Sequence, residues 1–207
     1  MFKTIATVTL PLAIGAAASA QVGPFTETFD NSSENWANSA GTACLDHFDD
    51  GGPTGAGDGF AAGSFNFAAT TADTDVVVAR AQDEFNSSNN EFVGDYIDAG
   101  ITELSFDIRH DLPTPANFFS RISGPANFPG AVAVEFAPIV PNEWTTISIA
   151  IDPSNPQFVT FEGATFDDVF SDVGHVQIGV RTPTAVAGLD NDFRFDIDNV
   201  SIIPAPG

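Results

Sequence analysis

The chain is poor in cysteine, in basic residues and in every aromatic type except phenylalanine. Its 207 residues include one Cys, two Trp and one Tyr, against 20 Phe. A single cysteine, Cys44, excludes an internal disulfide, and the acidic residues that follow it, Asp46, Asp49 and Asp50, disfavour a reactive thiolate. Six basic residues against 28 acidic ones give a net charge of −22. This charge excludes nucleic acid and anionic membrane surfaces as partners, because like charges repel.

Long apolar runs are also scarce. The only one, Ile5–Ala18, follows Lys3, the single lysine, and ends in the small residues Ala18-Ser19-Ala20. This is the pattern of a cleaved secretory signal. We therefore expect a signal peptide at residues 1–20, one domain at 21–203 and a tail at 204–207, in an extracellular or cell-surface location. No other stretch reaches 18 apolar residues, so we expect no membrane insertion of the mature chain.

Sequence motifs of enzymes are missing. The chain contains no G-x-S-x-G, no H-E-x-x-H and no G-x-x-x-x-G-K, and its three histidines show no zinc-site spacing. A glycosidase needs two carboxylates on either side of the scissile bond, and no strand carries an E-x-D-x-E-like pattern. The sequence thus predicts a protein that is not an enzyme.

Hydrophobic residues recur with a period of two. Within Thr102–Arg109, apolar residues alternate with polar ones, and Trp144–Ile151 and Val176–Arg181 repeat the pattern. Weaker candidate strands are Phe25–Phe29, Phe60–Phe67, Asp75–Arg80, Phe92–Ile97, Phe118–Ile122 and Val132–Phe136. Only Thr165–Ser171 has helical spacing. About ten strands and at most one short helix predict an all-β fold, an antiparallel two-sheet β-sandwich.

The last strand changes parity. Phe193, Phe195 and Ile197 occupy odd positions, whereas Val200 and Ile202 occupy even ones. The inward face of the strand therefore shifts by one residue at Asp198-Asn199, which predicts a β-bulge there.

Several segments carry a family resemblance. They are Glu27–Asp30 with Trp36, Phe92–Tyr96 leading into Leu104–Asp107, Trp144–Ile147, and Phe166–Val173 followed by Ile178–Arg181. Together they resemble the laminin B (laminin IV type A) domain and the related jelly-roll carbohydrate-binding modules, and the closing Phe195–Ile202 is typical of jelly rolls. The resemblance implies a jelly-roll sandwich with a non-catalytic role in adhesion or glycan binding. The tail Ile203–Gly207 is similar to the spacer before a PEP-CTERM sorting signal of bacterial surface proteins.

Acidic residues at both ends of the domain suggest a structural calcium site. In many jelly rolls the first and last strands are neighbours, and an acidic residue from each holds an ion. The resemblance carries this role to Glu27 and Asp198, with Asp30 beside them. Carboxylates gathered from both ends of a chain repel one another unless a cation joins them, and calcium takes six to eight oxygen ligands. The alternative is that these acids are solvated and that Asp30 begins a turn.

Candidate sugar-binding residues are aromatic. Trp36 lies in an Asn/Ser-rich loop, and one of the pair Phe118-Phe119 has to face away from the core because neighbouring strand residues point to opposite sides. Trp144 opens a patterned strand and is assigned to the core. We expect a calcium-stabilised module that binds polysaccharide or a cell-surface or matrix glycan. Two alternatives stay open, a purely structural surface protein and a cryptic glycan hydrolase or lyase.

Overall fold

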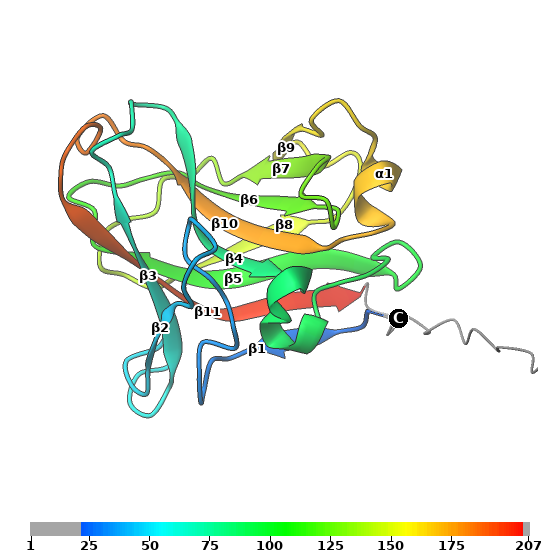
Figure 1. Ribbon diagram of the computed structural model, residues 1–207, viewed down its shortest axis with the longest axis horizontal. Coiled ribbons are helices and arrows are strands. Elements are labelled where there is room, and N and C mark those ends of the chain that lie inside the picture. Colours follow the sequence, from blue (N-terminus) through cyan, green and yellow to red (C-terminus); the bar gives the residue numbers. More distant parts are fainter. Residues whose placement is uncertain (1–21, 205–207) are drawn as a thin grey trace, which may run out of the picture.

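Two antiparallel sheets pack face to face (Figure 1) in the computed structural model, which describes residues 22–204. The predicted signal peptide and residues 205–207 of the predicted tail lie outside this range. One sheet contains β1 (Phe25–Glu27), β2 (Asp46–Phe48), β3 (Phe60–Asn66), β5 (Ile101–His110), β8 (Thr145–Ala150) and β11 (Asp192–Pro204). The other contains β4 (Asp75–Gln82), β6 (Phe118–Ser123), β7 (Gly130–Val134), β9 (Phe158–Thr160) and β10 (His175–Arg181). The predicted two-sheet β-sandwich is confirmed.

Strand order places chain ends and distant segments next to one another. The six-stranded sheet runs β2-β3-β11-β5-β8, with β1 also paired to β11, and the five-stranded sheet runs β4-β10-β6-β7-β9. The first and last strands are therefore neighbours, as the resemblance predicted, and Figure 1 shows the blue β1 beside the red β11.

The core fills the space between the sheets with the residues that the alternation predicted. On β5, Leu104, Phe106 and Ile108 are fully buried, while the polar residues between them face away from the second sheet. On β10, Val176, Ile178 and Val180 are buried in the same way from the opposite side. Burial on one face and polar side chains on the other fix the register of both strands.

Helices are few and short. The predicted helix is present as α1 (Phe166–Phe170), and it begins at a capping box in which Thr165 and Asp168 bond each other's backbone N–H. Two 3-10 helices, η1 (Asp83–Phe85) and η2 (Ser87–Asn90), follow β4. No helix within residues 22–204 has the length and hydropathy needed to cross a bilayer.

The predicted strands differ from the structure in three places. Phe92–Ile97, predicted as a strand, is a series of turns in which Tyr96 Oη donates to the Phe92 carbonyl at 2.9 Å. The Phe92 and Tyr96 rings are both buried, and these two residues gave the segment the apolar pattern that predicted a strand. The strands β2 and β9 were not predicted, because three residues are too few to establish a period of two.

Candidate functional site

The junction of β1 and β11 contains the predicted bulge. Glu27 pairs with Val200, and the register of β11 against β5 shifts between Asp198 and Ser201. Asn199 adopts a φ of 49°, in the left-handed region. The predicted β-bulge is therefore confirmed, and it turns the Asp198 side chain into a buried position with no exposed surface.

Asp198 lies among other carboxylates. Burial raises the pKa of Asp198 to about 7, and the negative charges of Asp58, Asp107 and Asp30 add to this effect. Within residues 22–204, the hydrogen bonds to its carboxylate come from Asn199, from the backbone N at 2.7 Å and from Nδ2 at 3.2 Å. Asn199 Nδ2 also donates to Asp107 Oδ2 at 2.9 Å, so it bridges two carboxylates. Either a proton or a cation compensates such a concentration of negative charge.

Of the other two predicted ligands, Asp30 adds its charge to this cluster, and Glu27 lies on the strand that pairs with β11. Glu27 is 8% exposed, and its Oε1 accepts from Phe29 N at 3.2 Å. Asp30 Oδ2 accepts from Thr28 Oγ1 at 2.9 Å. The loop that carries Asp58 packs directly on this turn, because a Cβ at Gly59 would lie 2.6 Å from the Phe29 carbonyl oxygen.

Sequence reasoning did not place Asp58 or Asp107 beside Asp198. Asp58 comes from the loop before β3, and Asp107 is the residue of β5 that pairs with Asp198. Neither position has a local signature: one is an acid in a glycine-rich loop and the other is an ordinary solvent-side residue of an alternating strand. Only the pairing of β11 with β5 brings Asp107 to the bulge.

Trp36 is buried, with no exposed surface. Its ring makes edge-to-face contacts with Phe29 and Phe92, each at 5.7 Å between ring centroids, and its Nε1 donates to Ser88 Oγ at 2.9 Å. The ring therefore presents no open face on which a sugar could stack.

The pair Phe118-Phe119 splits between the two sides of β6, as strand geometry requires. Phe118 belongs to the core, whereas Phe119 faces away from it and lies over Gly179, where an added Cβ would come within 2.1 Å of the phenyl ring. Phe119 is nevertheless only 5% exposed. Neither phenylalanine offers a free ring face to solvent.

A cleft of about 290 Å³ opens on the six-stranded sheet, lined by Arg109, His110, Asp111, Asn142, Arg194 and Asp196. The nearly buried Asp196 carboxylate organises it: its Oδ2 accepts from Arg109 Nε at 2.8 Å and its Oδ1 accepts from Arg194 Nε at 2.5 Å. Within the described part of the chain, Arg194 uses neither of its Nη atoms in a hydrogen bond. The cleft therefore has unused guanidinium donors, and the Asp196 carboxylate holds them in place.

Aromatic rings support both guanidinium groups from one side. Arg109 Cζ lies 4.5 Å from the Trp144 ring centroid, and Arg194 Cζ lies 4.0 Å from that of Phe48. Phe60 stacks on Phe48 at 5.0 Å and meets Trp144 edge-on. Trp144, assigned to the core from sequence, instead lies half-buried beneath the β2–β3 loop and donates to the Gly51 carbonyl at 3.1 Å.

The remaining cleft residues supply one fixed wall and two acceptors. His110 is buried, and burial lowers its pKa, so the ring is neutral. Its Nε2 donates to the Ile139 carbonyl at 3.1 Å and its Nδ1 accepts from Leu112 N at 3.2 Å, which makes the ring a fixed wall. Asp111 and Asn142 stand at the opening, where their oxygens can accept from a ligand hydroxyl.

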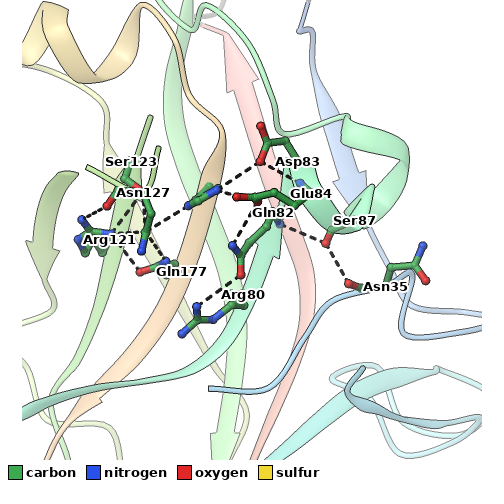
Figure 2. Close-up of polar contacts among 11 residues, drawn as sticks. Asn35, Arg80, Gln82, Asp83, Glu84, Ser87, Arg121, Ser123, Asn127 and Gln177 are labelled. Carbon is green, nitrogen blue, oxygen red and sulfur yellow. Dashed lines mark hydrogen bonds and ion pairs between the residues drawn. The ribbon is translucent and has the colours of Figure 1, made fainter. Parts of the chain in front are cut away.

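The outer face of the five-stranded sheet carries a different arrangement. The register sets two rows of polar residues across β4, β10 and β6: Gln82, His175 and Ser123 in one row, and Arg80, Gln177 and Arg121 in the other. Figure 2 shows that these side chains bond mostly to one another, and Asn127 from the β6–β7 loop joins them. Gln177 and His175 are almost fully buried. We call this set the polar face.

At one end of the polar face lies a candidate metal site. Asp83, Glu84 and His175 bring one potential ligand atom each to within 4.8 Å of the others. Within residues 22–204 no other group of three His, Cys, Asp or Glu residues meets this condition. The calcium ligands predicted from sequence are thus not the three residues whose ligand atoms lie closest together.

No protein-family model matches the chain, and no curated protein matches it. Solved structures share its fold. A Clostridium thermocellum endo-1,4-β-D-xylanase 10B, as CBM22-1 and GH10 modules complexed with xylohexaose, is similar with a TM-score of 0.52 and 16% identity, over 88% of this chain and 28% of that one. An exo-β-agarase is similar with a TM-score of 0.53 and 13% identity, over 89% and 26%. The L4b domain of human laminin α-2 has a TM-score of 0.38 and 13% identity, over 64% and 80%.

This chain spans about a quarter of the length of the xylanase and agarase chains. At such low identity the likeness establishes the β-sandwich fold. A protein that contains a CBM22 carbohydrate-binding module is among the structures that share this fold.

Proposed function

We propose that the chain is a secreted, non-catalytic domain that binds a neutral polysaccharide in the cleft formed by Arg109, Arg194 and Asp196. The observation that carries the proposal is the pair of guanidinium groups, which are anchored through Nε to one buried carboxylate. Within residues 22–204, Arg109 Nη1 donates to the Gly51 carbonyl at 3.2 Å, whereas both Nη atoms of Arg194 are unused. Ligand sites orient their ligand with a few fixed polar groups in a cleft. The cleft supplies such groups, and the Trp144 ring supports one of them, the Arg109 guanidinium, which lies over it at 4.5 Å.

The charge of the molecule favours a neutral glycan over an acidic one. The cleft contains two arginines and two aspartates, so it has no net charge of its own. The chain as a whole carries −22, which repels polyanions. Paired donors on a planar guanidinium fit two neighbouring hydroxyl oxygens, and Asp111 and Asn142 can accept from the hydroxyls of the same sugar.

The structural neighbours support this class of function. One is a xylanase whose CBM22-1 and GH10 modules were solved with xylohexaose, and another is an exo-β-agarase. Both act in contact with polysaccharides, and a chain of this size matches only about a quarter of each. A domain of similar fold with no enzyme motif in its own sequence is best understood as a binding module.

We also propose that calcium binds at the junction of β1 and β11. The buried Asp198 faces the charges of Asp30, Asp58 and Asp107, and Glu27 lies on the adjoining strand. Carboxylate oxygens are the ligands that calcium prefers. Because the ion would join the first and last strands to the β2–β3 loop, it would also hold the loop that covers Trp144.

Affinity gel electrophoresis against soluble xylan, mixed-linked glucan and agarose tests the binding proposal. We expect at least one polysaccharide to retard the protein. Arg194→Ala should weaken the association at least about tenfold, equivalent to about 1.4 kcal/mol. Trp144→Ala should have a similar effect. Arg181→Ala is the matched control, since the Arg181 side chain is 42% exposed and pairs with Asp75 on the other sheet.

Two outcomes would remove the proposal: no retardation by any polysaccharide, or equal weakening by Arg181→Ala and Arg194→Ala. The first outcome would favour the purely structural role. Release of reducing sugar from any of these polysaccharides would favour the hydrolase or lyase alternative.

A further inference from the structure

The turn after β4 places two consecutive carboxylates beside a buried histidine. Gln82 pairs with His175, so η1 begins next to the histidine, and Asp83 N donates to the Gly174 carbonyl at 3.1 Å. His175 Nε2 lies 2.9 Å from Glu84 Oε2 and 3.3 Å from Asp83 Oδ1. We propose that Asp83, Glu84 and His175 bind a divalent transition-metal ion of the zinc type.

The separations between the ligand atoms fit a small ion. Zinc holds nitrogen and oxygen ligands at about 2.0–2.2 Å, so neighbouring ligands lie roughly 2.9 Å apart at right angles and roughly 3.4 Å apart in a tetrahedron. The observed separations of 2.9 and 3.3 Å fall in this interval. Calcium holds its ligands at about 2.3–2.6 Å and takes six to eight oxygens. A site of two carboxylates and one imidazole is therefore matched to zinc chemistry rather than to calcium.

The histidine is also oriented as a metal ligand. Its Nδ1 lies 3.1 Å from Asn127 Oδ1, which accepts from Arg121 Nη1 at 2.8 Å and from Gln177 Nε2 at 2.9 Å. Two N–H donors identify this atom as the amide oxygen, so Nδ1 carries the hydrogen. Nε2 is then the nitrogen aimed at the carboxylates. Donation of the second ring N–H to an oxygen acceptor is the usual arrangement around metal-binding histidines.

The polar face thus acts as support for the site. Asn127 is fixed by side chains from β6 and β10, and Figure 2 shows these contacts leading from Arg121 across to the turn that carries Asp83 and Glu84. The His175 side chain has no exposed surface, so no solvent compensates Nε2. The structure therefore holds the nitrogen in position before an ion arrives.

Repulsion between the two carboxylates and access from solvent both favour an ion at this site. Two adjacent carboxylates, Asp83 and Glu84, face one imidazole nitrogen and repel each other when both are ionised. A divalent cation removes this difficulty. The Asp83 and Glu84 side chains are 27% and 53% exposed, so an ion can enter from solvent and retain a water ligand on that side.

Titration calorimetry of the full chain with zinc chloride, after removal of metals by a chelator and dialysis, tests the proposal. We expect one zinc ion to bind per chain, with no competition from millimolar calcium or magnesium. Glu84→Gln and His175→Gln should each weaken zinc binding more than about tenfold. His47→Gln is the matched control, because His47 is also a histidine next to an acid, with Asp49 at 3.4 Å, but lies outside the site. Cobalt bound at the same site should show the visible absorption of a low-coordinate ion.

Three results would overturn the proposal: no zinc binding, equal affinity in wild type and Glu84→Gln, or loss of binding in His47→Gln. In each case the trio would be a hydrogen-bonded cluster and not a metal site. Glu84 is half exposed, so its substitution leaves the fold intact even where His175→Gln does not fold. Neither glycan binding nor calcium binding enters this measurement, so it is independent of the proposed function.

Discussion

Replacing Asp198 by Asn should raise the stability in the absence of calcium and remove the gain in stability that calcium gives the wild type. In the absence of metal, the folded-state pKa of Asp198 is about 7, against an ordinary value of 3.8. A raised carboxyl pKa means that the folded state favours the protonated acid. The contribution of the protonated Asp198 side chain to the free energy of unfolding is fully present below pH 3.8 and is lost as the pH rises through about 7.

The size of this effect follows from the shift. About three pH units at 1.36 kcal/mol each give a cost of at most about 4 kcal/mol at pH 8. For a domain of roughly 180 residues, the unfolding entropy is about 0.4 kcal/mol/K, so this cost corresponds to about 10 °C in Tm. Asparagine cannot ionise, and it retains a carbonyl oxygen that accepts from Asn199 N. In chelator at pH 8, Asp198→Asn should therefore melt above the wild type by up to about 10 °C.

Calcium should narrow this difference in Tm. Bound calcium stabilises the ionised carboxylate, and an ion at 100 times its Kd adds about 2.7 kcal/mol to the free energy of unfolding. The wild type should gain several degrees in Tm on addition of calcium, whereas Asp198→Asn should gain almost nothing. Asp172→Asn, the same substitution at an exposed position, should leave both responses unchanged.

Differential scanning calorimetry at pH 5 and pH 8, with calcium or with chelator, measures all of these differences. If wild type and Asp198→Asn respond equally to calcium, no ion binds at the bulge. If Asp198→Asn is not stabilised relative to the wild type in chelator at pH 8, the charge at Asp198 does not carry the cost assigned to it.

Two further substitutions test packing. Gly59→Ala should lower the stability by about 1–3 kcal/mol, because the new Cβ would lie 2.6 Å from the Phe29 carbonyl oxygen. Gly23→Ala is the control, and it should change the stability little because nothing lies within 4 Å of its new Cβ. Equal melting temperatures of the two variants would contradict this account. Phe106→Ala should cost about 3–5 kcal/mol in chemical denaturation, because the ring is fully buried between the sheets. Phe136→Ala, at a ring that is 59% exposed, should have little effect, and comparable losses from the two phenylalanine substitutions would place the core elsewhere.

The sandwich was predictable because its strongest signals are local. On β5 the alternation of Leu104, Phe106 and Ile108 with polar residues needs only the neighbouring sequence to be recognised, and it survives in the structure without change. The bulge at Asp198 was predictable for the same reason, as a change of parity along one strand. Strands of three residues leave no such pattern.

The sites were less predictable because they are assembled from distant segments. Asp58 and Asp107 reach Asp198 only through the loop before β3 and the pairing of β11 with β5. His175 meets Asp83 and Glu84, about ninety residues earlier, only through the pairing of β10 with β4. No spacing in the sequence encodes these contacts.

The aromatic predictions show the same limit. Trp36 lies in a loop-like sequence, yet it is buried between Phe29 and Phe92, whereas Trp144 opens a patterned strand and lies at the edge of a cleft. Composition near a residue indicates the kind of element that contains it. It does not indicate which loop folds over that element.

The chain has two tryptophans, which allows a direct test of glycan binding in the cleft. Each indole N–H gives one signal in a proton–nitrogen correlation spectrum, and Trp144→Phe assigns them. On titration with an oligosaccharide from a polysaccharide that retards the protein, the Trp144 signal should move while the signal of the buried Trp36 stays fixed. Movement of Trp36 alone, or binding that leaves both signals unchanged, would contradict the assignment of the cleft as the glycan site.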